Sequence, residues 1–236
     1  MSVYSFTVND LKLPLTVRKH SKARSMVVRY QPINHSLTLT LPRYVSIKQG
    51  LTFIEEKRRW IEQQLAQKPA QICFHDGMRM EILGRRVTLK HVGGRGVVRL
   101  QADDETSEAH LLVSGDAEFF ARRVRDFLLR SARDEMTRLA NHYAARLGVS
   151  IRKISLRDTH SLWGSCNHAG HLSFSWRLVL APYEVLDYVV CHEVAHLVHL
   201  NHSKAYWQVV AMICPDFERH RDWLRQHGST LYRYRT

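Results

Sequence analysis

The run HEVAHLVHLNH, from His192 to His202, holds four histidines and one glutamate. His192 and His196 are four residues apart, so on a helix both imidazoles project from one face about a turn apart. Two imidazoles placed in this way can bind one zinc ion from the same side. Glu193 follows the first histidine, where its carboxylate can take a proton from a zinc-bound water as a general base. The run therefore predicts a catalytic metal site on a helix.

The residues around this run indicate that the helix is buried. Valine, leucine and alanine surround both histidines in EVLDYVVCHEVAHLV, residues 184–198. Unpaired polar side chains are costly on a buried helix, so the histidines and Glu193 must be paired, bound to a metal or facing a cleft. A hydrogen-bonded pair of core histidines is the alternative, and the glutamate and a third nearby histidine argue against it.

A catalytic zinc ion needs a third protein ligand and one open coordination position. His199 faces nearly the same way as His192, but three imidazoles in line along a straight helix cannot converge on one tetrahedral ion. Asn201 tolerates the left-handed conformation that ends a helix, and a turn there would bring His202 back towards the metal. We therefore expect His202 as the third ligand, ahead of His199 and of an acid such as Glu218.

The composition describes a globular protein. The chain has 236 residues, of which 44% are hydrophobic, enough for one large domain or two small ones. No stretch approaches the roughly 20 apolar residues of a membrane helix, and the N-terminus lacks the apolar core of a signal peptide. A cytoplasmic protein without a membrane partner is expected. The four cysteines form no C-x-x-C pair and are interpreted as reduced thiols.

The charge is strongly basic, with 35 Lys and Arg against 22 Asp and Glu and a formal charge of +13. Such an excess favours polyanionic partners such as nucleic acid or nucleotides. Six basic and no acidic residues lie between Leu11 and Tyr30. A solvated surface is the simpler explanation of this run, and a nucleic-acid contact is the second.

Residues 1–110 are predicted to form a basic, mostly β N-terminal region with one helix. Period-two hydrophobic patterns on both sides of QPINHS predict a β-hairpin. Ser46 is a candidate cap for a surface helix from Ile47 to about Gln67. Further short strands are expected around RMEILGRRVTLKHV, which bends at Gly84, and around GVVRL and HLLVS.

Residues 111–236 are the expected catalytic domain. Apolar residues at three- and four-residue spacings predict one long amphipathic helix over 116–148, ended by Gly148 in a left-handed conformation. IRKISLRD and HLSFSWRLVL predict two strands, and Pro182 is well placed to open the helix that carries the histidines. Ser203 can cap the helix that follows.

The segment LWGSCNHAGHLSFSWRLVLAPYEVLDYVVCHEVAHLVHLNHSKAYW, residues 162–207, strongly resembles the YgjP-like metallopeptidase-domain family. That family joins W-G-S-C to a P-x-x-V-x-D-Y-V-x-x-H-E-x-x-H-x-x-x-x-x-H-S-x-x-[FY]-W block, and a weaker resemblance extends over the rest of the chain. The resemblance implies an α+β, zincin-like fold of the minimal gluzincin type, distantly similar to SprT-like proteases. Such a fold has a long backing helix, a small mixed sheet and an H-E-x-x-H active-site helix.

On this chain the resemblance implies His192, His196 and His202 as ligands of one zinc ion and Glu193 as the general base. The spacing of the residues favours the same set. The family usually has a basic residue immediately before W-G-S-C, where Leu162 stands here, and any substrate contact of that residue is in doubt in this chain.

Further residues are candidate substrate contacts. Trp163, Gly164 and Ser165 are expected to shape a strand edge that can hold an extended peptide by backbone pairing. A simple packing turn is the alternative for this segment. Tyr206, His199 or an arginine is expected to donate to the tetrahedral oxyanion.

Three functions compete. The leading one is a zinc-dependent metallopeptidase acting on a peptide or protein substrate, with Glu193 deprotonating the attacking water. The same water could attack phosphorus, and the positive charge suits a nucleotide, so a nucleotide phosphohydrolase or pyrophosphatase is the second; its weakness is that GGRG, residues 93–96, lacks a Walker pattern. The third is a nucleic-acid-associated protease tethered by the basic N-terminal region.

Overall fold

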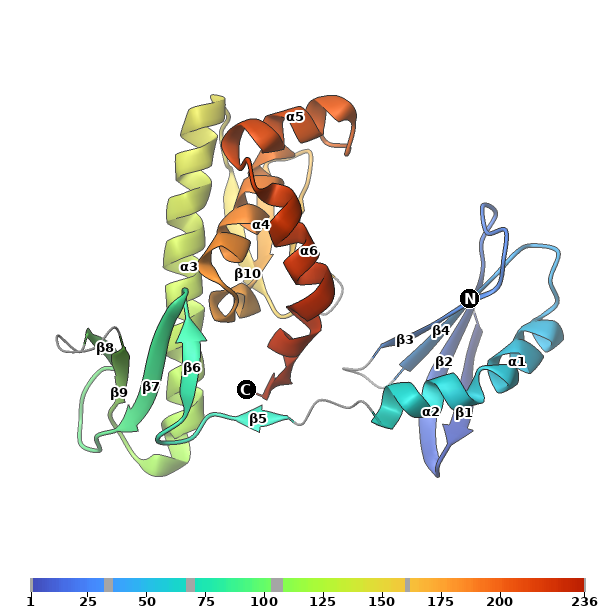
Figure 1. Ribbon diagram of the computed structural model, residues 1–236, viewed down its shortest axis with the longest axis horizontal. Coiled ribbons are helices and arrows are strands. Elements are labelled where there is room, and N and C mark those ends of the chain that lie inside the picture. The colour runs from blue at the N-terminus through green and yellow to red at the C-terminus, as the bar shows by residue number, and fades with distance from the viewer. Residues whose placement is uncertain (1, 32–35, 67–70, 103–107, 160–161, 236) are drawn as a thin grey trace. The chain divides into compact units, whose positions relative to one another are not determined.

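The computed structural model describes residues 2–31, 36–66, 71–102, 108–159 and 162–235. Its contacts separate two compact units, Met1–Ala70 and Gln71–Thr236, whose elements are labelled in Figure 1. Each unit has its own hydrophobic core. This division lies well before the seam that the sequence suggested near residue 110. The reason is physical: the strands between residues 79 and 113 bury their apolar side chains in the core of the C-terminal unit.

The N-terminal unit is a four-stranded mixed sheet with two helices. Its elements are β1 (Ser2–Val8), β2 (Leu11–Lys19), β3 (Val27–Gln31), β4 (Ser36–Leu41), α1 (Ile47–Glu56) and α2 (Arg58–Ala66). The strand order is β1-β2-β4-β3, with β1 and β2 antiparallel, β2 and β4 parallel, and β3 and β4 antiparallel. The antiparallel pair of β3 and β4 confirms the predicted pairing on the two sides of QPINHS.

Alternation along the strands gives this sheet one buried face. The buried residues of β2 and β4 are at most 3% exposed and pack with Ile54 of α1 and Ile61 of α2. They are Leu13, Leu15, Val17, Leu37, Leu39 and Leu41. Because the side-chain period of a strand is two, the residues between them lie on the opposite face.

The predicted cap at Ser46 is confirmed, but the single expected helix is two helices. The Gln49 N–H donates to Ser46 Oγ, and the Ser46 N–H donates to Gln49 Oε1, which completes a capping box. Lys57, with φ −91° and ψ 5°, interrupts the helix. Arg58 then donates from its guanidinium to the Thr7 carbonyl of β1 at 2.9 Å, which anchors the start of α2 to the sheet.

The C-terminal unit opens with a second four-stranded sheet. Its strands are β6 (Arg79–Ile82), β7 (Arg85–His91), β8 (Arg99–Ala102) and β9 (Ala109–Val113), in the order β6-β7-β9-β8. The predicted bend lies between β6 and β7, where Leu83 and Gly84 have φ values of 51° and 74°. Two successive left-handed residues are typical of a tight hairpin turn. The short strands β5 (Ile72–Cys73) and β13 (Tyr234–Arg235) pair in parallel.

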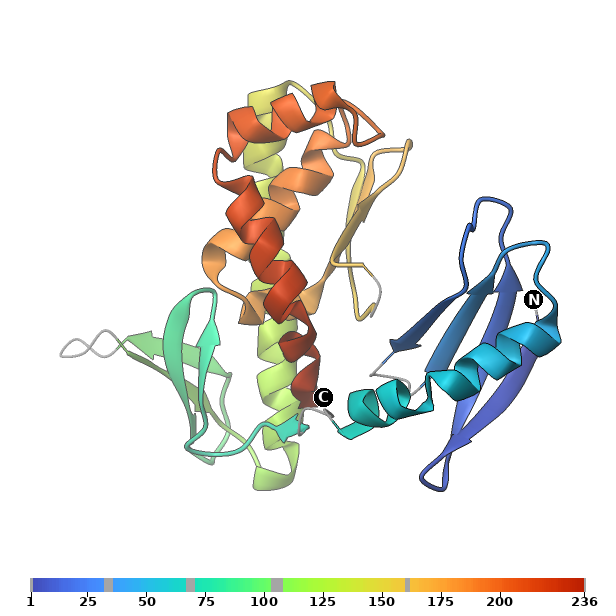
Figure 2. The same ribbon diagram turned by 45° about the vertical axis from the view of Figure 1, so that its right-hand side comes forward.

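A long helix, α3 (Phe120–Leu147), follows η1 (Ala117–Phe119) and passes behind the other helices of this unit (Figure 2). Its buried residues recur at three- and four-residue spacings, among them Val124, Leu128 and Met136. Gly148 ends the helix with φ 65°, as predicted. Helix α3 packs against the histidine helix α4 (Tyr183–Ala195) and against η2 (Trp176–Leu180), which precedes α4. The histidine helix therefore rests on α3.

The remaining elements surround that helix. They are β10 (Lys153–Arg157), β11 (Gly164–Cys166), β12 (His171–Ser175), η2 (Trp176–Leu180), α4 (Tyr183–Ala195), α5 (Lys204–Ile213), α6 (Phe217–His227) and η3 (Gly228–Arg233). The strands form a three-stranded sheet in the order β10-β12-β11, in which β10 and β12 are parallel and β11 and β12 antiparallel. The predicted strand over HLSFSWRLVL is a strand only to Ser175, and Trp176 onwards is a 3-10 turn.

One buried arginine ties the end of the chain to this core. Arg177 is 5% exposed and forms a bidentate pair with Asp158 at 2.7 and 3.1 Å. Its third nitrogen donates to the carbonyls of Leu231 and Tyr234. The buried guanidinium is tolerated because each of its three nitrogens donates a hydrogen bond.

The chain is thus a mixed α+β protein built on small mixed sheets. Within the described residues, no helix has both the length and the apolar character needed to cross a membrane.

Candidate metal centre

Helix α4 presents the H-E-x-x-H residues from a buried position. Pro182 immediately precedes its first residue and makes no side-chain capping bond, and Val190 and Val194 are fully buried beside His192 and His196. The regular helix ends at Ala195, earlier than expected, and the backbone then continues through tighter turns in which the N–H groups of residues 197 and 198 bond to carbonyls three residues back.

The turn before His202 differs in its mechanism from the one that the sequence suggested. Among described residues other than glycine, positive φ occurs at Asn9, Asp10 and Leu83, and therefore not at Asn201. The Asn201 side chain instead accepts the Ser203 N–H at 3.2 Å, because a short amide can turn the chain by bonding its own backbone two residues on. Ser203 caps α5 as predicted by accepting the N–H of the residue three positions later.

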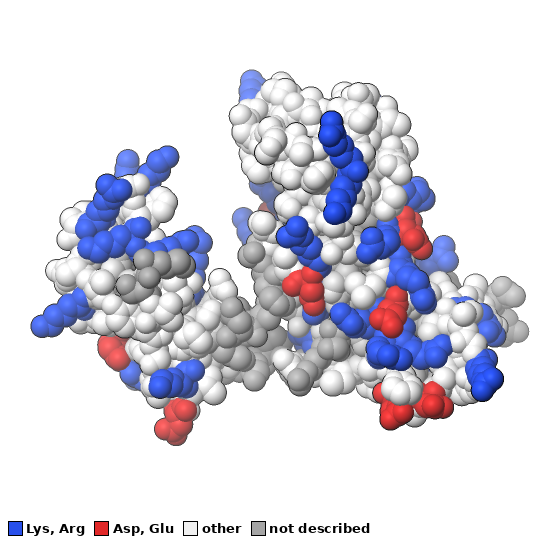
Figure 3. All heavy atoms as spheres, turned by 180° about the vertical axis from the view of Figure 1, so that it is seen from behind, with Lys and Arg blue, Asp and Glu red and all other residues white. Residues whose placement is uncertain are grey.

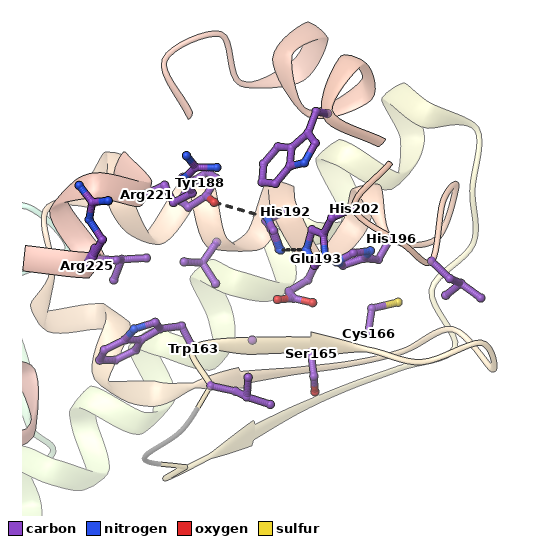
Figure 4. A pocket seen from close by; sticks show the side chains of 16 residues that line it. Trp163, Ser165, Cys166, Tyr188, His192, Glu193, His196, His202, Arg221 and Arg225 are labelled. Atoms are coloured by element: carbon purple, nitrogen blue, oxygen red, sulfur yellow. Dashed lines mark hydrogen bonds between the residues drawn. The ribbon is translucent and has the colours of Figure 1, made fainter. Parts of the chain in front are cut away.

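Three of the four histidines come together. One ligand nitrogen from each of His192, His196 and His202 lies within 4.8 Å of the others, and Figure 4 shows the rings clustered above the strand that carries Ser165. The Nε2 atoms of His192 and His202 are 3.2 Å apart. His192 and His196 come from α4, whereas His202 comes from the connection to α5, so the rings approach one point from two directions.

Neighbouring groups orient the rings. His196 Nδ1 lies 3.0 Å from the His199 carbonyl oxygen. Since a carbonyl only accepts, Nδ1 carries the proton and Nε2 keeps the lone pair that a metal needs. Tyr206 donates to the His192 carbonyl at 3.0 Å and stacks on the His196 ring, with centroids 4.4 Å apart. The Tyr188 hydroxyl lies 3.4 Å from His192 Nδ1.

The electrostatic setting favours the neutral form of His192 and His196. Burial, and then the neighbouring imidazoles of His196 and His202, lower the pKa of His192 to about 3. Burial also lowers the pKa of His196. Neutral imidazole is the form that binds a metal ion, so His192 and His196 are held in the state that coordination requires.

Glu193 is packed against β11. It is 5% exposed, and burial raises the pKa of its carboxyl to about 8. A Cβ at position 164 would lie 2.5 Å from Glu193 Cγ and 2.6 Å from its Oε1. Gly164 is therefore the residue that leaves room for the carboxylate beside the strand, and no larger residue fits without movement.

These residues line a pocket of about 710 Å³. Strand β11 and the residues before it form one wall, with Trp163 stacked on Tyr232 at 5.0 Å between centroids. In Figure 4 the Ser165 side chain points away from the histidines, while Cys166 points towards them. Burial, followed by the charge of Glu193, raises the pKa of the Cys166 thiol to about 11, so this sulfur is a neutral wall group.

Two of the predicted substrate contacts lie outside the pocket lining. Among described residues, His199 and Tyr206 are not part of the pocket lining. His199 contributes its carbonyl to His196, and Tyr206 is 0% exposed with its hydroxyl bonded to the His192 carbonyl. Both therefore bond to candidate metal ligands without lining the pocket.

Other pocket residues were not found from the sequence. Arg221 and Arg225 of α6 line the pocket, and Arg221 lies over the Trp207 ring at 5.3 Å. Trp207 in turn stacks on His202. The α6 arginines lie in a helix whose sequence shows only an ordinary charged pattern, and the spacing of the motif gave no signal for them.

Three imidazoles beside a buried carboxyl group, at the floor of an open pocket, are the features of a metallohydrolase site. The comparison with protein families agrees, since the YgjP-like, metallopeptidase domain matches residues 24–227. The chain belongs to the YgjP-like family, which implies a metal ion and a peptide or protein substrate. Comparison with curated proteins and with solved structures gave no match.

Proposed function

We propose that this chain is a zinc-dependent metallopeptidase with a zincin-like catalytic domain. His192, His196 and His202 hold one zinc ion, and Glu193 is the general base. The observation that carries this proposal is the approach of the three histidine nitrogens to within 4.8 Å of one another beside the buried glutamate.

The donor set fits zinc. Three imidazoles leave one position of a tetrahedral shell open, which is the pattern of catalytic sites, whereas structural sites are closed by four protein ligands. When bound, the ion would polarise the scissile carbonyl and make the attacking water more acidic.

The residues of this chain supply the other steps. Glu193 takes a proton from the attacking water and passes it to the leaving amine as the carbon–nitrogen bond breaks. Strand β11 is an edge of its sheet, so its backbone is available to pair with an extended peptide. A peptide paired with β11 would lie beside the base, because Gly164 lies next to Glu193. Arg221 and Arg225 supply positive charge along the same pocket.

Metal analysis tests the ligand set. The purified wild type is expected to hold about one zinc per chain. His202→Ala should lose the zinc, and the control His199→Ala should keep it, because His199 contributes a backbone carbonyl that the substitution preserves. Retention by the first variant and loss by the second would reject the assignment.

Catalysis is tested by Glu193→Gln, which keeps the size of the side chain and removes its basicity. Zinc content should be unchanged, while peptide hydrolysis should fall by roughly 10²- to 10⁴-fold. An unchanged rate would mean that another group activates the water.

A nucleotide phosphohydrolase is the second candidate, and the two pocket arginines are the observation that favours it, because guanidinium groups bind phosphate in bidentate fashion. Wild type and Glu193→Gln are assayed in parallel on peptide and nucleotide panels. Hydrolysis of nucleotides alone, lost in the variant, would replace the peptidase proposal.

A further inference from the structure

The N-terminal sheet has a second face that carries positive charge and hydroxyl groups. We name it the open sheet face; its charged and threonine residues on β2, β3 and β4 are Lys12, Thr16, Arg18, Arg29, Thr38 and Thr40, and Pro14 of β2 and Val27 of β3 lie on it as well. All alternate with the buried residues of their strands, and α1 and α2 pack on the opposite side. The three basic side chains are exposed.

The register places these residues in adjacent rows. Thr16 lies beside Thr38, which lies beside Arg29 on the next strand. Arg18 lies beside Thr40 and donates from Nε to its hydroxyl at 3.0 Å. At a strand spacing of about 4.8 Å, the two arginines stand roughly 10 Å apart across the sheet, with the threonines between them.

Charge is segregated within this unit. Strands β1 to β4 contain no acidic residue. Of the four acidic residues in 1–70, Asp10 lies in the turn between β1 and β2, and Glu55, Glu56 and Glu62 lie on α1 and α2. In Figure 1 the two helices of this unit lie in front of its sheet. Figure 3 views the molecule from the opposite side, and on this unit lysine and arginine side chains outnumber acidic ones there.

The chemistry of the face selects its partner. Arginine matches the geometry of a phosphate group, and threonine hydroxyls donate to phosphate oxygens. The face has no aromatic side chain that would stack on bases or anchor in a lipid headgroup layer. Such a surface contacts a phosphate backbone and does not distinguish bases.

We infer that the open sheet face binds the phosphate backbone of nucleic acid without sequence preference. This site is distinct from the metal centre, since it is formed by strands of the N-terminal unit alone. It gives the chain a binding activity that does not depend on whether the metal centre cleaves peptides or nucleotides.

The experiment measures binding of the full chain to short fluorescein-labelled DNA and RNA strands by anisotropy, between roughly 50 and 200 mM salt. Arg18→Gln/Arg29→Gln should weaken binding at least about tenfold and reduce the slope of log Kd against log salt by about two. The matched control Lys48→Gln/Arg59→Gln removes the same charge from the helix side and should change Kd by less than about twofold, because distant exposed charges are screened.

A second variant protects the test against misfolding. Arg18→Gln removes the bond to Thr40, so Lys12→Gln/Arg29→Gln leaves that bond in place and should reproduce the lower salt slope. Circular dichroism verifies that each variant unfolds at the temperature of the wild type. The DNA and RNA arms show which nucleic acid binds more tightly.

Three results would overturn the inference. The first is absence of oligonucleotide binding at low salt. The second is equal weakening by the open-face and helix-side variants, which would reduce the effect to net charge. The third is binding to vesicles of anionic phospholipid, with the same dependence on Arg18 and Arg29, by a protein that does not bind oligonucleotides; the face would then be a membrane-surface site.

Discussion

The two four-stranded sheets of this chain have the same topology and different uses. The orders β1-β2-β4-β3 and β6-β7-β9-β8 both place a parallel pair between two antiparallel pairs, and a helix follows each sheet. After the first sheet the helix α1 has 10 residues, whereas after the second α3 has 28 and spans about 42 Å.

This difference indicates that the length of the helix after the sheet, and not the strand order of the sheet, distinguishes the unit that carries the candidate metal site. Helix α3 is long enough to pack against β9 and also against η2 and α4. In the described part of the chain the buried polar residues are Ser114, Ser175, Arg177, Glu193 and His196, all in the C-terminal unit. The N-terminal unit buries an apolar core alone and keeps its polar groups on the surface.

The largest effects are expected from equivalent core truncations in the two units. Leu39 of β4 and Leu111 of β9 are both 0% exposed, and replacing either by alanine should cost about 2–5 kcal/mol of unfolding free energy. Leu111→Ala should lower the temperature at which zinc is released and hydrolysis stops. Leu39→Ala should lower only the temperature at which oligonucleotide binding is lost. Loss of zinc from Leu39→Ala would show that the two cores are not separate.

Two glycines, Gly164 of β11 and the buried Gly50 of α1, sharpen the comparison. Gly164→Ala places a Cβ against Glu193. Under the proposed function it should lower kcat/KM for peptide hydrolysis about 100-fold, equivalent to ~2.7 kcal/mol, with zinc content unchanged. Gly50→Ala meets the flexible side chains of Leu39 and Leu41 and should cost about 1–3 kcal/mol of stability with no change in kcat/KM. Ser173→Ala, on the strand beside Gly164, is the control for kcat/KM, and equal losses in the glycine and serine variants would contradict the steric explanation.

The sequence could predict the local part of the metal centre, because four-residue spacing on a helix is a local property. The position of His202 followed from the requirement for a second direction of approach. The contact between Gly164 and Glu193 joins residues far apart in the chain, and Arg221 reaches the pocket only because α6 packs beside α4. Neither follows from a periodic pattern.

The fold was predictable to a similar extent. Strand pairs, the Ser46 cap and the end of α3 at Gly148 depend on neighbouring residues. The extent of the N-terminal unit depends on which core the second sheet joins, and that choice is made by tertiary packing. The repeated strand order could not be seen either, since the two sheets share topology without similar sequences.

A smaller effect is expected inside the C-terminal unit. The Tyr143 hydroxyl lies 2.9 and 2.8 Å from the two carboxylate oxygens of Asp187. Tyr143→Phe should destabilise this unit by about 1–3 kcal/mol, because it leaves a part-buried carboxylate without its donor. Thermal unfolding, monitored by the release of zinc, measures this destabilisation. An unchanged melting temperature would mean that water replaces the hydroxyl.

The smallest effect is a dependence of stability on pH. Burial raises the pKa of Asp187 above its ordinary value of 3.8, so the folded protein binds this proton more tightly than the unfolded chain. The stability from this group is full below the ordinary value and falls as pH rises through the folded pKa. Asp187→Asn should remove this decline in unfolding curves taken from pH 4 upwards, and an identical pH profile for the variant would contradict the shift.

The stacking of Trp207 on His202, with ring centroids 5.6 Å apart, has an optical consequence. If His202 binds the metal as proposed, the indole of Trp207 lies directly against a ligand ring. Loading the centre with a paramagnetic ion such as Co²⁺ should therefore quench Trp207 emission, and Trp207→Phe should abolish that part of the signal. Under the proposed ligand set, Trp207 would then report metal occupancy by its fluorescence, before any substrate is known.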